Sequence, residues 1–215
     1  EYGIPIMVDA AQSAGVFSID LQDSGIDYLC LAGHKGLYGP MGTGVLITAK
    51  GEELDTLIEG GTGTNSASYE QPPALPDRFE SGTPNMPGIA GLRAGVEFVT
   101  RKGTKQILRH ESQLILYLYD CLSRMHGVTL YMPRPDPCYF APLLSFNIEG
   151  KNSETVGQML SQNGIAVRAG LHCAPTAHKV CGTLETGAVR VCPSVFTQKN
   201  EIDYFLMTLG KIIRK

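Results

Sequence analysis

The chain has 215 residues, 43% of them hydrophobic, and a formal net charge of −3. That balance offers no basic surface to nucleic acid, and no apolar run approaches the ~20 residues that span a bilayer, so neither nucleic acid nor a membrane is expected as a partner. The six cysteines stand at irregular spacings without a CxxC pair, which argues against a disulfide framework and against a structural zinc site. These features predict a globular cytoplasmic protein with reduced thiols.

Short apolar runs alternate with glycine turns at the start of the chain. The elements predicted there are strands over residues 4–8, 28–32 and 45–48, a short helix over 10–15, and a glycine-rich loop over 36–44. Continuous apolar strands of this kind belong to parallel or mixed sheets that are covered on both faces. A strand pattern at the very first residues, without an initiator Met, predicts a chain cut from a longer one. The alternative is a domain that begins with this strand.

The remainder of the chain contains longer helices. Residues 60–87 are rich in Gly, Pro, Ser, Thr and Asn, and so long an irregular segment is expected to have a use. The other predicted elements are helices over 89–101, 104–125, 153–163 and 197–213, the last two capped by Ser153 and Thr197, and strands over 128–132, 143–148, 165–168 and 188–191. A boundary near residue 100 divides a glycine-rich α/β part, residues 1–100, from an α+β part, residues 101–215.

Asp9 stands at the carboxyl end of the first predicted strand, where open α/β sheets place ligand contacts. A carboxylate there needs a partner, and one good partner is the protonated ring nitrogen of pyridoxal phosphate. Gln12, three residues later, could reach the phenolic oxygen of that ring. The alternative is an aspartate that caps the helix after the strand.

Lys35 follows the second predicted strand, on a turn after Gly33 and His34. A lysine at such a place is costly unless it is neutralised or used covalently. A Schiff base does both, because burial makes an amine more nucleophilic. His34 could donate to a phosphate, and the glycines of the loop let the backbone approach a ligand closely. Read alone, this lysine would be a surface turn residue.

Two motifs together carry a resemblance to a known family. They are residues 8–12, Val-Asp-Ala-Ala-Gln, and residues 32–40, Ala-Gly-His-Lys-Gly-Leu-Tyr-Gly-Pro. In order and separation they resemble the paired signatures of class V aminotransferase-like enzymes, the cysteine desulfurase and selenocysteine lyase family. The resemblance implies a fold type I pyridoxal-phosphate enzyme. Lys35 would hold the cofactor, Asp9 and Gln12 would contact its ring, and His34 would bind its phosphate.

The resemblance also implies an α/β architecture. Residues 1–100 would be part of a large cofactor-binding domain with a mainly parallel sheet and helices, and residues 101–215 a smaller α+β domain that carries a cysteine loop. Residues 79–85 resemble the segment with which the family crosses a dimer interface. A homodimer is therefore expected, in which Thr83 contacts the cofactor phosphate of the neighbouring subunit. The alternative is an ordinary Gly-Thr-Pro turn.

Residues 168–175, Arg-Ala-Gly-Leu-His-Cys-Ala-Pro, resemble the catalytic-cysteine loop of the short-loop subgroup of the family. The resemblance implies that Cys173 attacks the sulfur of a cofactor-bound cysteine, keeps it as a persulfide and releases alanine. Only a thiolate is nucleophilic, so nearby positive charge is required, and Arg168, His172 or His178 could supply it. The alternative is a buried structural cysteine.

Residues 187–191, Gly-Ala-Val-Arg-Val, resemble the strand whose arginine clamps the substrate carboxylate. A guanidinium suits that task because two parallel hydrogen bonds fix the orientation of a carboxylate. Arg190 lies on an otherwise apolar strand, where an unpaired charge would be costly. The alternative is an internal ion pair.

The function implied is that of a pyridoxal-phosphate-dependent cysteine desulfurase, which acts on L-cysteine and hands sulfur to an acceptor protein. Selenocysteine lyase and class V aminotransferase are the enzymatic alternatives, and a truncated, non-catalytic association module is the third. A metal-binding module ranks last, because the spacing of His172, Cys173, His178 and Cys181 matches no common zinc pattern; no metal site is predicted. One departure from the family pattern concerns the cofactor. Ala32 stands where relatives often carry a phosphate-binding serine.

Overall fold

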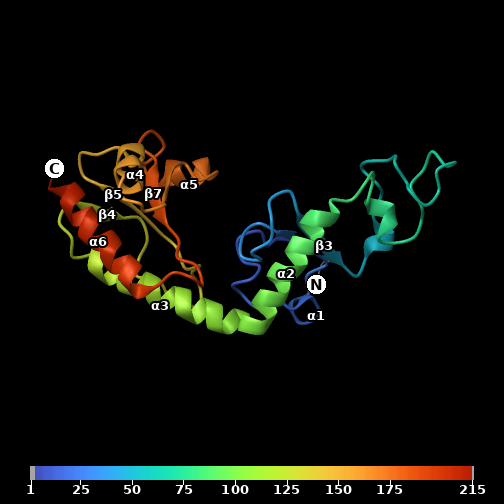
Figure 1. Ribbon diagram of the computed structural model, residues 1–215, viewed down its shortest axis with the longest axis horizontal. Coiled ribbons are helices and arrows are strands. Elements are labelled where there is room, and N and C mark those ends of the chain that lie inside the picture. The colour runs from blue at the N-terminus through green and yellow to red at the C-terminus, as the bar shows by residue number, and fades with distance from the viewer. Residues whose placement is uncertain (1–2, 215) are drawn as a thin grey trace. The chain divides into compact units, whose positions relative to one another are not determined.

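The computed structural model describes residues 3–214 and divides into two compact units, Glu1–Lys105 and Gln106–Lys215 (Figure 1). Each unit has a sheet and a hydrophobic cluster of its own. Within the described range, no helix is long and apolar enough to cross a membrane.

The first unit is built on a three-stranded mixed sheet. Strand β2 lies in the middle, parallel to β1 and antiparallel to β3. The strands are β1 (Met7–Asp9), β2 (Tyr28–Ala32) and β3 (Gly44–Thr48), and the helices are α1 (Leu21–Ser24), η1 (Gly51–Glu53), η2 (Asp77–Phe79) and α2 (Met86–Lys102). The antiparallel β3 makes the sheet mixed, which is one of the two arrangements that the apolar strand patterns predicted.

The first strand differs from its prediction in extent and in burial. It begins at Met7, and the side chains of Ile4, Ile6 and Met7 are 73%, 50% and 62% exposed. Residues 10–15 form turns rather than the predicted short helix, and Gly15 at the end of the segment has a left-handed backbone with φ of 85°. A continuous apolar run predicts a strand whose two faces are both packed against other parts of the protein. Within this chain, the side chains around β1 are not packed in that way.

Backbone-to-backbone contacts pack the loop that follows β2. A Cβ added to Gly36 would overlap the carbonyl oxygen of Ala14, and one added to Gly15 would overlap the carbonyl oxygen of Gly36. On the other side, a Cβ on Gly95 of α2 would overlap the carbonyl oxygen of Leu37. The loop after β2 is thus held between the turn after β1 and helix α2 by contacts that only glycine permits.

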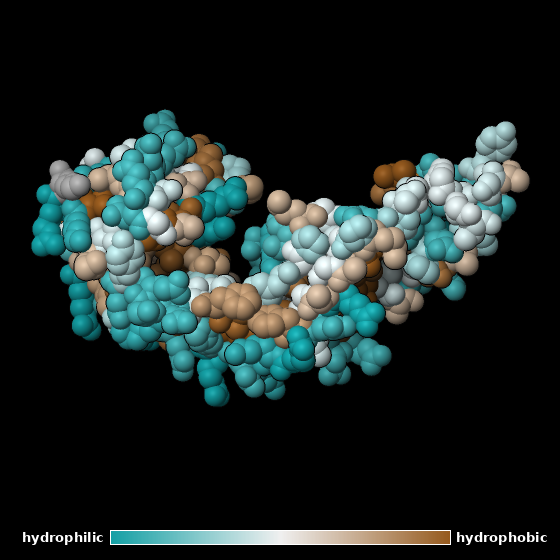
Figure 2. Space-filling view, viewed as in Figure 1, coloured by the Kyte–Doolittle hydropathy of each residue, from teal (hydrophilic) through white to brown (hydrophobic). Residues whose placement is uncertain are grey.

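The segment between β3 and α2 is long and irregular, as predicted. Figure 2 shows hydrophobic side chains on its surface, and Leu57, Ile58 and Tyr69 are among its exposed residues. A close contact tethers it: the amide of Gly82 donates to the carbonyl of Gly60 at 3.1 Å. A Cβ on Gly61 would lie 2.8 Å from the Cα of Gly82, so the two stretches meet through glycine backbone.

The second unit is an antiparallel sheet with helices on both faces. Its strand order is β4-β5-β7-β6. The strands are β4 (Val128–Leu130), β5 (Leu144–Ile148), β6 (Arg168–Gly170) and β7 (Ala188–Val191), and the helices are α3 (Thr104–Leu122), α4 (Ser153–Ser161), α5 (Pro175–Val180) and α6 (Lys199–Ile213).

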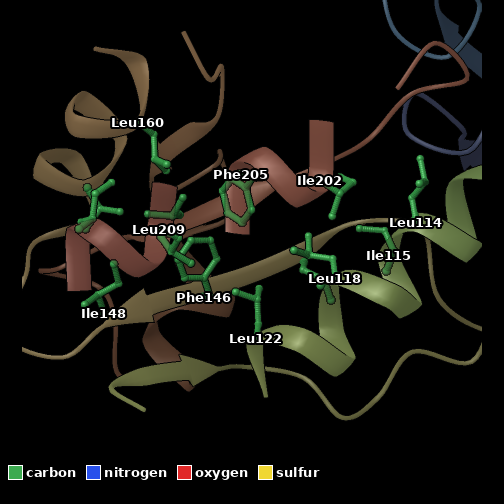
Figure 3. Packing of buried hydrophobic residues seen from close by; sticks show 14 residues of the cluster. Leu114, Ile115, Leu118, Leu122, Phe146, Ile148, Leu160, Ile202, Phe205 and Leu209 are labelled. Atoms are coloured by element: carbon green, nitrogen blue, oxygen red, sulfur yellow. The ribbon is translucent and has the colours of Figure 1, made fainter. Parts of the chain in front are cut away.

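Side chains on one face of this sheet form the larger core of the protein. Figure 3 shows leucines and isoleucines of α3, α4 and α6 converging on Phe146 and Ile148 of β5. Phe146 and Phe205 meet edge to face, with 6.1 Å between their ring centroids. The other face of the sheet carries Ser145 and Ala188, which line a cavity of about 220 Å³ together with His178 of α5.

Several boundary predictions in this unit are wrong, among them the end of the helix predicted over 104–125, which ends at Leu122. The strand expected over 165–168 begins at Arg168 and continues to Gly170. Helix α4 is capped by Asn152, because the hydroxyl of Ser153 donates instead to the carbonyl of Thr186 at 2.6 Å. Helix α6 is capped by Gln198, which forms a capping box with Glu201, rather than by Thr197.

Replacing Gly36 with alanine is expected to destabilise the first unit by about 2 kcal/mol, as for other forced overpacking. The physical reason is the overlap of the new Cβ with the Ala14 carbonyl, since neither backbone can retreat without disturbing the sheet. Urea unfolding followed by circular dichroism would measure the change.

Gly25→Ala is the matched control. Gly25 has a φ of 67° but open space around it, so alanine there bears only the left-handed backbone cost, about 1 kcal/mol. If Gly36→Ala cost no more than Gly25→Ala, the packing described for this loop would be wrong.

Candidate active site

Asp9 ends β1 at the carboxyl edge of the parallel pair, in register with Cys30 of β2. Its Oδ1 accepts a hydrogen bond from the amide of Ala11 at 2.9 Å, and the residue is exposed. The bond is the local turn contact anticipated by the capping alternative, although no helix follows. Among the described residues, Oδ2 accepts no hydrogen bond, so one carboxylate oxygen is available to a ligand.

Lys35 lies on the turn that follows β2, at the same edge of the sheet as Asp9. The turn is closed by two backbone bonds, from Tyr38 to the Lys35 carbonyl at 2.9 Å and from Gly39 to the Gly33 carbonyl at 2.8 Å. Lys35 is half-buried rather than buried. Within residues 3–214 its ammonium forms no ion pair shorter than 4.0 Å, so the amine is not committed to a carboxylate.

The other three residues predicted to bind a cofactor are exposed: Gln12, His34 and Thr83. Gln12 stands in the turn after β1 and His34 in the turn after β2, so both follow the same pair of strand ends as Asp9 and Lys35. Thr83 follows Gly82, whose φ is 78°, in the segment tethered to Gly60. All five residues belong to the first unit.

Cys173 belongs to the second unit, on the loop between β6 and α5. His172 and Cys173 both have left-handed backbones, with φ of 53° and 59°, which is uncommon for side chains with a Cβ and often marks functional loops. The loop leaves the sheet where Gly170 meets Gly187, since a Cβ on Gly187 would lie 2.8 Å from the Cα of Gly170. Cys173 is an exposed thiol, and the alternative of a buried structural cysteine is therefore wrong.

Arg190 lies on β7, half-buried, beside this loop. In the sheet it is directly opposite Ser145 of β5 and Arg168 of β6. Among the described residues neither arginine forms an ion pair within 4.0 Å, so the alternative of an internal ion pair does not describe Arg190.

Both ring nitrogens of His172 are buried, and Arg190, His178 and Arg168 are the basic side chains that act on the ring. Burial lowers its pKa below the usual value, and the positive charge of Arg190 lowers that pKa further. Its ring is 5.5 Å from that of His178, which is buried and contacts the Thr183 hydroxyl through Nδ1 at 2.8 Å. His172 is therefore a neutral side chain at physiological pH.

The chain matches a known protein family over most of its length. The profile of the Aminotransferase class-V family matches residues 1–205. The chain belongs to this family. Probable cysteine desulfurases of Halalkalibacterium halodurans and Xylella fastidiosa are 36% and 34% identical to it, each over 98% of this chain. The chain spans 51% and 50% of these two relatives, about half of their length.

Solved structures confirm the fold class of this class V chain. The apo cysteine desulfurase of Thermococcus onnurineus NA1 superposes with a TM-score of 0.86 at 34% identity, over 99% of this chain and 53% of that one. The cysteine desulfurase CsdA of Escherichia coli, in an S-sulfonic acid form, gives a TM-score of 0.88 at 29% identity, over 99% of this chain and 52% of that one. The resemblance drawn from the motifs is thereby confirmed.

Enzymes of the class V family generally use pyridoxal phosphate. The residues after β1 and β2 fit that cofactor, because a carboxylate with a free oxygen and an amine without an acidic partner follow neighbouring parallel strands. A metal is not implied by the same residues: within residues 3–214, no group of three His, Cys, Asp or Glu side chains is arranged to hold a metal ion.

Two features of the site were missed by sequence reasoning. Thr43 closes the glycine-rich loop, accepting from Gly33 through its carbonyl at 3.0 Å and donating its hydroxyl to the Pro40 carbonyl at 2.7 Å. The pairing of Arg168 with Arg190 was also missed, because the strand carrying Arg168 was placed too early in the chain. A threonine among closely spaced glycines was a sequence signal for the role of Thr43. No sequence signal indicated that Arg168 and Arg190 are opposite each other, because this depends on strand register.

The neutral state of His172 predicts a pH effect on the second unit. Its pKa in the folded chain lies below the ordinary 6.5, so the unfolded chain binds protons more readily as the pH falls. The free energy of unfolding should therefore decrease as the pH drops below about 6.5 toward the folded-state pKa. Urea unfolding at a series of pH values, compared with His172→Gln, would show a shallower acid decline in the variant.

His126 is an exposed histidine of the same unit, so His126→Gln is the matched control and should retain the acid decline of the unaltered chain. Identical pH profiles for His172→Gln and the unaltered chain would contradict the assignment of a buried, neutral His172.

Proposed function

We propose that the whole protein is a pyridoxal-phosphate-dependent cysteine desulfurase, which converts L-cysteine to L-alanine and retains the sulfur on Cys173. The observation that carries the proposal is the parallel pairing of β1 with β2, since it sets Asp9 and the Lys35 turn at one edge of one sheet. The names of the relatives and of the similar solved structures support the same reaction.

When bound, pyridoxal phosphate supplies an electron sink for the α-carbon of an amino acid. In the proposal the free oxygen of Asp9 keeps a proton on the ring nitrogen, and Gln12 contacts the phenolic oxygen. His34 donates a hydrogen bond to the cofactor phosphate. In a homodimer, Thr83 contacts the cofactor phosphate of the second subunit. Lys35 binds the cofactor and then moves the proton at the substrate α-carbon.

The residues of the second unit complete the proposed reaction. Arg190 binds the substrate carboxylate, for which its unpaired guanidinium is suited. The thiolate of Cys173 attacks the substrate sulfur, so that a sulfur–sulfur bond forms and the carbon–sulfur bond breaks. The electron pair of the broken bond stays with the carbon skeleton, which takes up protons and leaves as alanine. The exposure of Cys173 supports later transfer of the persulfide sulfur to an acceptor protein.

All six cysteines of the chain are free thiols, which supports a reducing, cytoplasmic location for the protein. The two units correspond in the proposal to part of the large cofactor-binding domain and to the small domain that carries the cysteine loop.

Lys35→Ala is expected to abolish the visible absorbance of lysine-bound cofactor in the longest natural protein that carries these residues. The reason is that the amine follows the same strand pair as Asp9 and is not held by an acid. Spectra with and without added pyridoxal phosphate make the measurement, with Lys102→Ala as a control, an exposed lysine at the end of α2. Survival of the absorbance in Lys35→Ala would refute the role of Lys35.

Cys173→Ala is expected to lower alanine production from cysteine by at least about 100-fold while leaving cofactor absorbance in place, since removing a covalent nucleophile removes the step that depends on it. Cys138→Ala, at another exposed thiol, should leave the rate unchanged. Cysteine, selenocysteine and an amino-donor/keto-acid pair should be assayed together. Faster turnover of selenocysteine, or transamination, with no loss in Cys173→Ala would replace the proposal with one of those activities.

A further inference from the structure

Two arginines stand side by side on the face of the second sheet that carries the cysteine loop. Arg168 of β6 and Arg190 of β7 are direct partners in the antiparallel register, so their side chains project from the same face. Like charges directly opposite one another are unfavourable, and within residues 3–214 no carboxylate forms an ion pair with either. This part of the sheet is therefore suited to bind an anion that the second unit does not itself supply.

One of the two guanidiniums contacts the loop sulfur. Nη2 of Arg168 lies 3.9 Å from Sγ of Cys173. The contact joins the last strand before the loop to the loop's own nucleophile, and both residues are exposed. A guanidinium at that distance offers N–H donors and positive charge to a sulfur anion.

The other cationic candidates near Cys173 are less suited to this task. His172 has buried nitrogens, and its pKa is lowered by burial and by Arg190, so it carries no charge at neutral pH. His178 is buried, and its Nδ1 is occupied by the hydroxyl of Thr183 at 2.8 Å. Arg190 is assigned to the substrate carboxylate in the proposed reaction. Arg168 is the cation that remains.

We propose that Arg168 is the positioning residue for the sulfur of Cys173, holding the thiolate before the reaction and the terminal sulfur anion of the persulfide after it. The two arginines then bind two anions at once. Arg190 binds the substrate carboxylate, and Arg168 binds the sulfur of Cys173. The persulfide half of this inference rests on the proposed function; the thiolate half rests only on the contact between Arg168 and Cys173.

Alkylation of the resting thiol tests the inference without cofactor or substrate. Iodoacetamide reacts with thiolates, and mass spectrometry of the 215-residue chain gives the rate at each cysteine separately. At neutral pH, Arg168→Gln should slow alkylation of Cys173 about fivefold, the change expected for losing one unit charge near 4 Å in water. Arg168→Lys should retain most of the rate, since it keeps the charge.

Two matched controls lie in the same unit. Arg134→Gln removes an arginine already paired with Asp120 at 2.8 Å and should leave the rate at Cys173 unchanged. Cys138 is an exposed thiol whose pKa is raised by a hydrogen bond to Asp136, so it reports the opposite charge environment in every sample. Its rate should not respond to any change at Arg168.

A salt series on the unaltered chain makes the test independent of whether a variant folds. Raising the salt concentration to about 1 M screens exposed charges, so alkylation should slow at Cys173 and quicken at Cys138. Equal rates at Cys173 in Arg168→Gln and the unaltered chain, or a Cys173 rate that does not fall with salt, would overturn the inference. Neither result would bear on alanine production, so failure here is distinguishable from failure of the desulfurase proposal.

Discussion

The candidate site depends on a backbone contact that leaves no room for a side chain. Gly36, next to Lys35, presses against the carbonyl of Ala14, while Gly15 presses against the carbonyl of Gly36. This contact locks the turn after β1 to the turn after β2. Parallel pairing of the strands brings their carboxyl ends to one edge, and the glycines determine how the turns at that edge meet. An acid and an amine far apart in sequence are thereby held on one rigid piece of backbone.

The second unit also has a close contact between glycines, here beside the loop that carries Cys173. Gly170 and Gly187 meet at the point where the cysteine loop leaves the sheet, and His172 and Cys173 in that loop have left-handed backbones. The antiparallel register then aligns Arg168 with Arg190, a repulsive pair unless anions are bound. Burial and the charge of Arg190 lower the pKa of His172, which favours its neutral form. Positive charge on this face is therefore concentrated on guanidiniums, which keep their charge at every physiological pH.

The sequence predicted the fold class and the long helices, because a family signature and helical periodicity are written in contiguous residues. The sequence-based predictions were wrong where residues distant in the sequence determine burial, capping or strand pairing. Residues 4–8 are apolar enough for a buried strand, but Ile4 and Ile6 are exposed in this chain. Ser153 and Thr197 are good capping residues, yet Asn152 and Gln198 cap the helices. The opposition of Arg168 and Arg190 depends on strand register, which local sequence does not specify.

In the proposed enzyme, Lys35 and Asp9 bind the same cofactor. This shared role is tested most directly by borohydride trapping in the longest natural protein with these residues. After incubation with pyridoxal phosphate and reduction, peptide mass spectrometry should find the pyridoxyl group on Lys35, and far less of it when Asp9 is replaced by alanine. A pyridoxyl group on another lysine, or equal labelling of many lysines, would contradict the account.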